Sequence, residues 1–549
     1  MPWLQAYSPV AGSAGLSAAV AALPLVVVFV CLAVLRMKAV KATSLALLTA
    51  FALAVVAWGM PAKLAVLSSL QGAAFGLFPI YFLVLATLFL YNITVKGGQF
   101  QVIRSSIAGV TPDRRLQALL IAFCFGAFIE GCAGFGAPVA IAGATLVGLG
   151  FRPFYAAGLC LVANTAPVAF GSIGIPIVAL AGVMGLNDAG LLKLSAMVGH
   201  QLPIVSFIVP FYIVVLMAGF RRTIEVLPAV LTCGGVFATC QWATSSYLGP
   251  YLPDIVSSLA SMGALLLLLR FWSPRTIFRF EHETDAPATA AAHTGKQVFR
   301  AWLPYLTLTA AVLAWGLPPV KAALDRTTVL LPVPGLNGSV VRTPVTRAVV
   351  APPPVAVPAV FKFDYLASGG TAVLVAALLS SLLCGVGAGQ TARVFADTLY
   401  GMRIPAITFA AVVALAYVMN FSGMTACLGI FCTKAGYFFP FLSPILGWLG
   451  VFLTGSDTSS NVLFGGIQKT AAEQLGINPI LTCAANTSGG VVGKMISPQS
   501  IAVACAATGM VGEEGSLFRF TLKHSLALLM IVSVLVFLQA YCLTWMIPS

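Results

Sequence analysis

A polar triplet occurs twice in this chain, first as Ala163-Asn164-Thr165 and again as Ala485-Asn486-Thr487. Each copy keeps the same spacing to a later proline, because Pro176 and Pro498 both lie twelve residues after their asparagine. Amide and hydroxyl groups donate and accept hydrogen bonds, and the nearby glycines and prolines interrupt helices. Repeated interruptions inside apolar segments are typical of transporters in which two broken helices meet at one binding site. We therefore predict that both asparagines and both threonines contact a small polar substrate.

Two acidic residues lie in the apolar stretches that precede the triplets, Glu130 before the first and Asp457 before the second. An ionised carboxylate is unfavourable inside a membrane, so such a residue usually has a partner or a task. Apolar surroundings favour the neutral form of a carboxyl group, which makes either acid a candidate carrier of a coupled proton. A structural ion pair, or a place at the membrane interface, is the alternative for each acid.

The second copy also carries a cation, Lys494, at a position where the first copy has Ser172. We predict that Lys494 either compensates a substrate carboxylate or pairs with Asp457. The alternative is a lysine whose ammonium group reaches the membrane interface. Ser456 and Ser459, on either side of Asp457, are further candidate ligands of the substrate.

His200 begins the apolar segment that follows the first copy. An unperturbed imidazole titrates near neutral pH, so His200 is a further candidate for proton transfer. A lone histidine is more often a hydrogen-bonding group at an interface, and this alternative stays open.

The elements that must position these groups are membrane-spanning helices. Of the 549 residues, 60% are hydrophobic and only 8% are charged, whereas soluble domains average about 25% charged residues. We predict an all-α polytopic membrane protein with about 12–16 transmembrane segments, including two broken-helix hairpins. Apolar runs of spanning length are readable at 16–35, 43–60, 72–94, 197–219, 226–248, 254–272, 301–319, 365–385, 404–423 and 525–546.

The net charge of +14 comes largely from Lys and Arg in short loops between these runs. The positive-inside rule places those loops in the cytoplasm and both termini outside. From these loop positions we can count how often the chain crosses the membrane. The count predicts that the two triplet regions enter the membrane from opposite faces and so form an inverted repeat. The segment 320–362 has mixed charge and many prolines, so we expect it to be outside and irregular.

This pattern divides the chain into two transmembrane halves. The first half is 1–272, with a hairpin motif near 126–176, and a cytoplasmic loop follows at 273–300. The second half is 301–549, with a hairpin motif near 450–498. We expect no cofactor, metal or nucleic acid, because no nucleotide-binding, metal-ligand or basic-aromatic pattern is present. Membrane lipid is the expected surrounding, and the oligomeric state stays open.

Several long motifs of this chain closely resemble the bacterial L-lactate permease family. They lie at 128–138, 163–171, 421–424, 454–461 and 497–500, and the similarity runs nearly end to end. The resemblance implies a secondary transporter of the inner membrane that imports L-lactate, and often glycolate, together with protons.

A looser likeness connects the two triplets with the paired Ser-Asn-Thr hairpins of sodium-coupled dicarboxylate carriers. Sodium therefore remains an alternative coupling ion. A channel and a membrane-embedded enzyme are less favoured alternatives, because no convergent catalytic set stands out and the duplicated hairpins suit a carrier.

Overall fold

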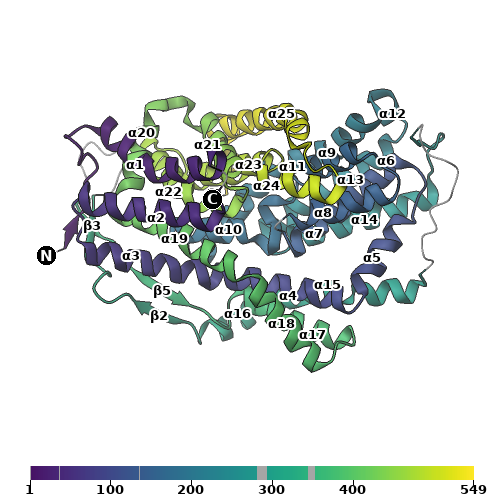
Figure 1. The fold of residues 1–549 in the computed structure, drawn as a ribbon, viewed down its shortest axis with the longest axis horizontal. Coiled ribbons are helices and arrows are strands. Elements are labelled where there is room, and N and C mark those ends of the chain that lie inside the picture. The colour runs from purple at the N-terminus through teal and green to yellow at the C-terminus, as the bar shows by residue number, and fades with distance from the viewer. Residues whose placement is uncertain (1, 36, 135, 281–292, 344–352, 549) are drawn as a thin grey trace.

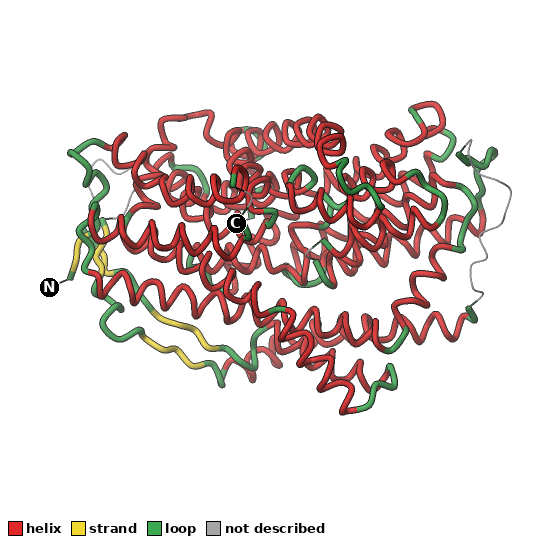
Figure 2. Tube along the Cα trace, in the orientation of Figure 1, coloured by secondary structure: helices red, strands yellow, loops and turns green. Residues whose placement is uncertain are grey.

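Helices make up most of the computed structural model, which describes residues 2–35, 37–134, 136–280, 293–343 and 353–548 (Figures 1 and 2). Within these residues, 11 helices are long and apolar enough to cross a membrane, and up to 12 if one bent pair counts as a span. The predicted class, an all-α polytopic membrane protein with broken helices, is confirmed. Part of the predicted loop 273–300 lies outside the described residues.

The first helices pack against helices from the far end of the chain. They are α1 (Ala14–Phe29), α2 (Ala39–Val56), α3 (Ala62–Phe75), α4 (Phe82–Lys96) and α5 (Gln99–Ala108). In α2, an alanine at every fourth residue from Ala42 to Ala54 is fully buried, and this helix packs against α19 (Arg403–Ser422). Small side chains let helices approach closely in lipid. Figure 1 shows α1–α3 beside α19, α20 and α22 in one half of the molecule.

The first copy of the repeat is interrupted twice. Its elements are α6 (Arg114–Gln117), the π-helix η3 (Ala118–Phe125), α7 (Gly126–Cys132), α8 (Ala137–Gly148), α9 (Pro153–Ala163), the short 3-10 helix η4 (Val168–Phe170) and α10 (Gly171–Met184). At the start of α10, three successive residues, 172–174, have left-handed backbone with φ of 46°, 59° and 74°. One of them is Ile173, for which this conformation is strained, so regular helix resumes only near Pro176.

The second copy repeats this order. Its elements are α21 (Phe439–Thr454), α22 (Asp457–Leu475), α23 (Pro479–Lys494) and α24 (Pro498–Thr508). Interruptions lie at 455–456 and 495–497, and Pro498 begins the half-helix after the second one, where the first copy has Pro176. A long helix follows each copy, α11 (Asp188–Ala218) after the first and α25 (Glu514–Tyr541) after the second.

The remaining helices complete the bundle. They are α12 (Phe220–Ile224), α13 (Leu227–Tyr247), α14 (Pro253–Phe271), α15 (Gly295–Gly316), α16 (Pro318–Asp325), α17 (Gly369–Leu383), α18 (Ala388–Gly401) and α20 (Met424–Cys432). Short 3-10 turns, η5 (Thr433–Phe438) and η6 (Thr544–Met546), follow α20 and α25. The helices α13 and α14 form a hairpin, and α14 packs against α7.

A buried cation anchors the helical segment that leads to α7. The guanidinium group of Arg115 is fully buried and lies 2.8 Å from both the Asp113 and the Glu225 carboxylates. It also donates to the backbone carbonyl oxygens of Arg222 and Thr276. These bonds join the start of this segment to the region around α12 and to the chain that follows α14.

The prediction of an irregular segment at 320–362 is wrong for its described part. It contains α16 and the strands β2 (Val329–Pro332), β3 (Val340–Arg342), β4 (Val355–Ala356) and β5 (Val360–Phe363). Strands β2 and β5 pair in antiparallel fashion, and β3 pairs with both β4 and the N-terminal β1 (Trp3–Leu4). The valine-rich runs between the prolines satisfy their backbone groups by pairing with one another. The N-terminal residues therefore lie on the same face as this segment.

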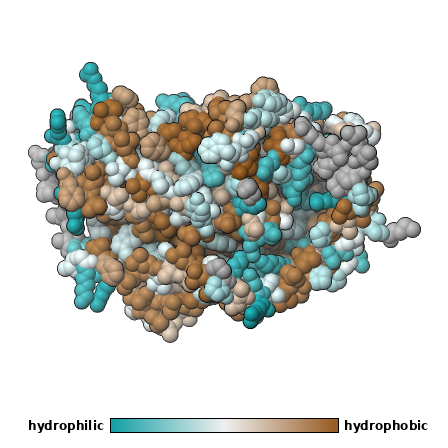
Figure 3. Space-filling view, turned by 180° about the vertical axis from the view of Figure 1, so that it is seen from behind, coloured by the Kyte–Doolittle hydropathy of each residue, from teal (hydrophilic) through white to brown (hydrophobic). Residues whose placement is uncertain are grey.

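The outer surface carries many large apolar side chains. Val56, Phe271 and Leu382 are 84%, 83% and 75% exposed, and Figure 3 shows hydrophobic residues over much of one face. Water-soluble monomers rarely expose continuous apolar areas of this extent, whereas lipid tails cover them. The protein is therefore a multi-pass membrane protein.

Two glycines bring α21 and α23 into backbone contact. A Cβ atom on Gly447 would overlap the carbonyl of Asn486, and one on Gly489 would overlap the carbonyl of Pro444. Backbone carbonyls cannot swing aside as a side chain can, so these positions require glycine. Because α21 and α23 pack this closely, the end of α23 lies near the break between α21 and α22.

We expect Gly489→Ala to lower the melting temperature of the purified protein by several degrees, because overpacking typically destabilises by about 1–3 kcal/mol. Thermal unfolding in detergent measures this. The matched control is Gly263→Ala in α14, where the added Cβ meets no atom within 4 Å. The control should melt at the same temperature or slightly higher, since alanine favours helix over glycine. Equal effects of the two changes would contradict the backbone contact.

Candidate functional site

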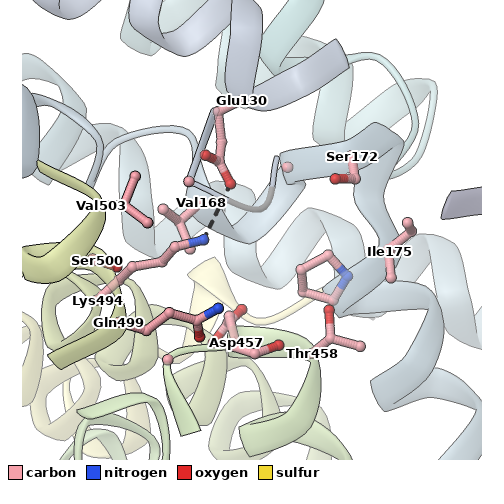
Figure 4. Close-up of a pocket in the computed structure, with 15 residues that line it drawn as sticks. Glu130, Val168, Ser172, Ile175, Asp457, Thr458, Lys494, Gln499, Ser500 and Val503 are labelled. Atoms are coloured by element: carbon pink, nitrogen blue, oxygen red, sulfur yellow. Dashed lines mark hydrogen bonds and ion pairs between the residues drawn. The ribbon is translucent and has the colours of Figure 1, made fainter. Parts of the chain in front are cut away.

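The helix interruptions of both copies meet at one cavity inside the bundle (Figure 4). Its free volume is about 70 Å³, several times what one buried water molecule needs. From the first copy, the polar side chains that line it are those of Glu130 and Ser172. From the second copy they are those of Ser456, Asp457, Thr458, Lys494, Gln499 and Ser500. The cavity therefore lies between the two copies and draws polar groups from each.

An ion pair connects the two copies across this cavity. Lys494 Nζ lies 3.4 Å from Glu130 Oε1, and these side chains are only 12% and 3% exposed. Asn164 Nδ2 donates to the other carboxylate oxygen, Oε2, at 3.2 Å. Both oxygens of Glu130 thus accept from a donor, as an ionised carboxylate does. Asn164 therefore orients Glu130 through this hydrogen bond and does not itself line the cavity.

The predicted pairing of Lys494 with Asp457 is wrong, because Glu130 is its partner. Lys494 ends α23 next to the break at 495–497, and its side chain reaches toward the first copy (Figure 4). Asp457 lies at the start of α22 on another side of the cavity.

A series of hydrogen-bonded side-chain amides leads to Asp457 on the side away from the cavity. Asn461 Nδ2 lies 3.4 Å from Asp457 Oδ2, and Asn486 Nδ2 donates to Asn461 Oδ1 at 2.9 Å. Gln468 Nε2 then donates to Asn486 Oδ1 at 3.3 Å. The other carboxylate oxygen of Asp457, Oδ1, has no hydrogen-bond partner among the described residues. Asn486 therefore positions the group that holds Asp457, and it does not line the cavity itself.

The second triplet does not lie at an unwound segment, contrary to the prediction. Asn486 and Thr487 are fully buried within α23, which continues to Lys494. In the first copy, α9 ends at Ala163, four residues before Pro167, and the residue of the second copy that is equivalent to Pro167 is Gly489. Proline lacks the amide hydrogen that a helix needs, while glycine permits the helix to continue against α21. The break consequently moves to the end of α23.

The other predicted ligands lie away from the first cavity. Thr165 donates to the carbonyl of Val162 at 2.7 Å, and the hydroxyl of Thr487 has no partner among the described residues. The ring nitrogen Nδ1 of His200 bonds to the carbonyl of Met546 near the C-terminus. This contact fits the alternative in which His200 is a hydrogen-bonding group between packed segments.

A second cavity of about 240 Å³ adjoins the first. It lies among α1, α2, α19 and α22, and its lining includes Lys38 and the predicted ligand Ser459. Ser456 and Gln499 line both cavities. These two side chains therefore form the partition between a small polar chamber and a larger, mostly apolar one.

Two helices begin at the first cavity. Ser456 caps α22 by accepting from the amide of Ser459 at 3.3 Å, and Ser497 caps α24 by accepting from the amide of Ser500 at 3.2 Å. The first turn of a helix carries partial positive charge, which favours an anion. These helix ends and Lys494 bring positive charge to the cavity, opposite the carboxyl groups of Glu130 and Asp457 that also line it.

Several cavity residues, Ser172, Thr458, Gln499 and Ser500, were not predicted as ligands, and a buried acid behind the cavity, Asp254, was also missed. Asp254 is the second residue of α14, directly after Pro253, and is 1% exposed. An acid at the start of an apolar run suggests an interfacial position. Its burial depends on the fold of the α13–α14 hairpin, which periodicity alone does not show.

Comparisons with known sequences show the family of this chain. The family model for L-lactate permease matches residues 17–543. The chain is 48% identical over 575 residues to an L-lactate permease of Bacillus subtilis, and 47% identical over 565 residues to the glycolate permease GlcA of Escherichia coli, with both alignments covering 100% of each chain. Among solved structures, the YdaH transporter of Alcanivorax borkumensis matches with a TM-score of 0.47 and 17% identity, covering 86% of this chain and 87% of that one. The chain belongs to the L-lactate permease family.

Proposed function

We propose that this protein imports L-lactate, and short 2-hydroxy monocarboxylates such as glycolate, across the bacterial inner membrane together with protons. Full-length relatives named for L-lactate and for glycolate support the substrate class. The observation that carries the proposal is the buried Glu130–Lys494 pair, which bridges the two copies at a chamber of small volume. A single buried ammonium suits a substrate with a single negative charge.

In this proposal, the substrate carboxylate takes the place of Glu130 beside Lys494. The hydroxyl and amide groups of Ser172, Thr458 and Gln499 face the same chamber and are suited to a 2-hydroxyl group. The apolar side chains of Val168 and Val503 also line it and offer a surface for the methyl group of lactate. The site thus combines one cation, several neutral polar groups and an apolar wall.

Charge balance explains why a proton accompanies the substrate. The pair of Glu130 and Lys494 is neutral, so an added carboxylate leaves one uncompensated negative charge in a buried place. A proton on Glu130 restores neutrality. Proton co-transport also removes the opposition of an inside-negative membrane potential, which is about 2.3 kcal/mol per 100 mV for one negative charge.

Alternating access requires a route from the chamber to each face. The second cavity supports such a route, since it adjoins the chamber at Ser456 and Gln499 and carries Lys38 in its lining. Lys38 and Arg403 belong to loops that the positive-inside rule assigns to the cytoplasm. We therefore assign the second cavity to the cytoplasmic route and both termini to the outer face.

Reconstitution into liposomes decides the coupling ion. With an acidic exterior and no sodium gradient, we expect lactate to accumulate, up to about tenfold per pH unit for one proton per lactate. A sodium gradient at equal pH should give no accumulation. Accumulation driven by sodium alone would contradict proton coupling, and rapid flux without accumulation would indicate a channel.

We expect Lys494→Gln to weaken lactate binding by about 30-fold or more, because truncating one partner of a buried charge pair typically removes 2–5 kcal/mol. Isothermal titration calorimetry of the purified protein measures the Kd. The control Lys434→Gln changes an exposed lysine and should leave the Kd within about twofold. The double change Glu130→Gln with Lys494→Gln should recover thermal stability but not binding. Unchanged binding by Lys494→Gln would remove Lys494 from the site.

Ser459→Cys tests the proposed cytoplasmic route. A membrane-impermeant maleimide should label it from the face of Lys38, because Ser459 lines the second cavity, and lactate should change the labelling rate. The control Ser488→Cys replaces a fully buried residue of α23 and should stay unlabelled from both faces. Labelling of Ser459→Cys only from the opposite face would reverse the assignment.

A further inference from the structure

Asp254 is a buried acid whose carboxylate has no partner in the described part of the chain. It is 1% exposed, and neither Oδ1 nor Oδ2 accepts a hydrogen bond there. Its side chain packs directly on α7, since a Cβ atom on Gly131 would lie 2.8 Å from Asp254 Cβ. Gly131 follows Glu130, so the two acids belong to neighbouring positions of the same contact between α7 and α14.

The two acids have opposite environments. Glu130 accepts from Lys494 on one oxygen and from Asn164 on the other, as an anion requires. The titratable groups on α7, the helix on which Asp254 packs, are Glu130 and Cys132. The helix α13 and the segment 118–125, which also pack against α14, contain no charged residue. An ionised Asp254 would therefore lie beside a second negative charge with no cation of its own.

We propose that Glu130 and Asp254 form a proton-sharing acid pair, in which Asp254 holds the proton while Glu130 is paired with Lys494, and that this pair binds the coupled proton. The proposal rests on the proposed function and adds to it the residue where the proton is held. Two neighbouring carboxyl groups with one cation titrate as a unit, so the pair and not a single acid takes up the proton.

The cycle balances in charge and in protons. When a substrate carboxylate takes Lys494, the proton of Asp254 passes to the freed Glu130, and Asp254 becomes a carboxylate. Asp254 is the second residue of α14, and the amino end of that helix stabilises this transient anion. A proton delivered from the bulk solution as hydronium then neutralises Asp254, so one substrate anion and one proton have entered the site. Release of the substrate returns Glu130 to Lys494 and frees one proton.

Asp457 differs from this pair in position and in support. It is held by Asn461 in the second copy, and Asn461 also donates to the carbonyl of Pro176 at 3.1 Å. Asp457 therefore helps to join α22 to the first copy. The acid pair places proton binding on α7 of the first copy and on α14, whereas Lys494 supplies the cation from the second copy.

The test uses the full-length protein in liposomes with Asp254→Asn, which keeps the size of the side chain but cannot release a proton. Two activities are compared at matched protein content: lactate–lactate exchange at equal pH on both sides, and net accumulation driven by a pH gradient. Asp397→Asn makes the same chemical change at an exposed residue of α18 and serves as the control.

We expect Asp254→Asn to keep exchange within about twofold of the parent protein and to lose about tenfold or more of its gradient-driven accumulation, because an amide at position 254 cannot pass a proton to Glu130 or take one up in its place. Exchange by the variant should also lose the pH dependence that the parent shows. Asp397→Asn should match the parent in both activities.

Two results would overturn the acid pair. One is accumulation by Asp254→Asn at the level of the parent, and the other is loss of exchange and accumulation together in a variant that melts at the temperature of the parent. Failure of the proposed function is a separate result, since the parent protein itself would then not accumulate lactate under a pH gradient.

Discussion

A buried ammonium group in a membrane protein needs an anion or backbone carbonyl oxygens beside it. Lys494 satisfies this constraint with Glu130, at 3.4 Å, although the two residues come from different copies of the repeat. The pair therefore links the break after α23, in the second copy, to the break after α7, in the first copy. In the function proposed above, a substrate carboxylate that enters the chamber competes with Glu130 for the same cation, and this competition is what would couple substrate to protons.

Broken helices are tolerated at membrane depth only where other protein groups satisfy the freed backbone. Here the breaks meet one another, and serine caps and side-chain amides supply the missing partners. The two copies have the same order of helices, but their second breaks lie at different positions. Pro167 ends the helix at the first triplet, whereas Gly489 lets α23 continue against α21. The order of helices is repeated, but the charged groups differ, since Glu130 comes from the first copy and Lys494 from the second.

The charged and polar residues of the chamber were predictable to a large extent. Glu130, Asp457, Lys494 and Ser456 line it, and the first three stand out because charges are rare in apolar segments. Asn486 and Thr487 were misplaced, because whether a Gly-rich segment unwinds depends on the helix that packs against it. Asp254 was missed, because its neighbour Glu130 is distant in sequence and the α13–α14 hairpin brings them together.

Hydropathy, charge spacing and the duplicated triplet were sufficient to establish a polytopic helical protein with two broken hairpins, since these properties follow from the membrane as solvent. They did not identify which acid pairs with Lys494, where the second hairpin breaks, or that a third acid lies behind the chamber. Those features depend on contacts between segments that are far apart in the chain. A local pattern shows that a charge needs a partner, but helix packing selects the partner, because pairing requires atoms within a few ångströms of each other.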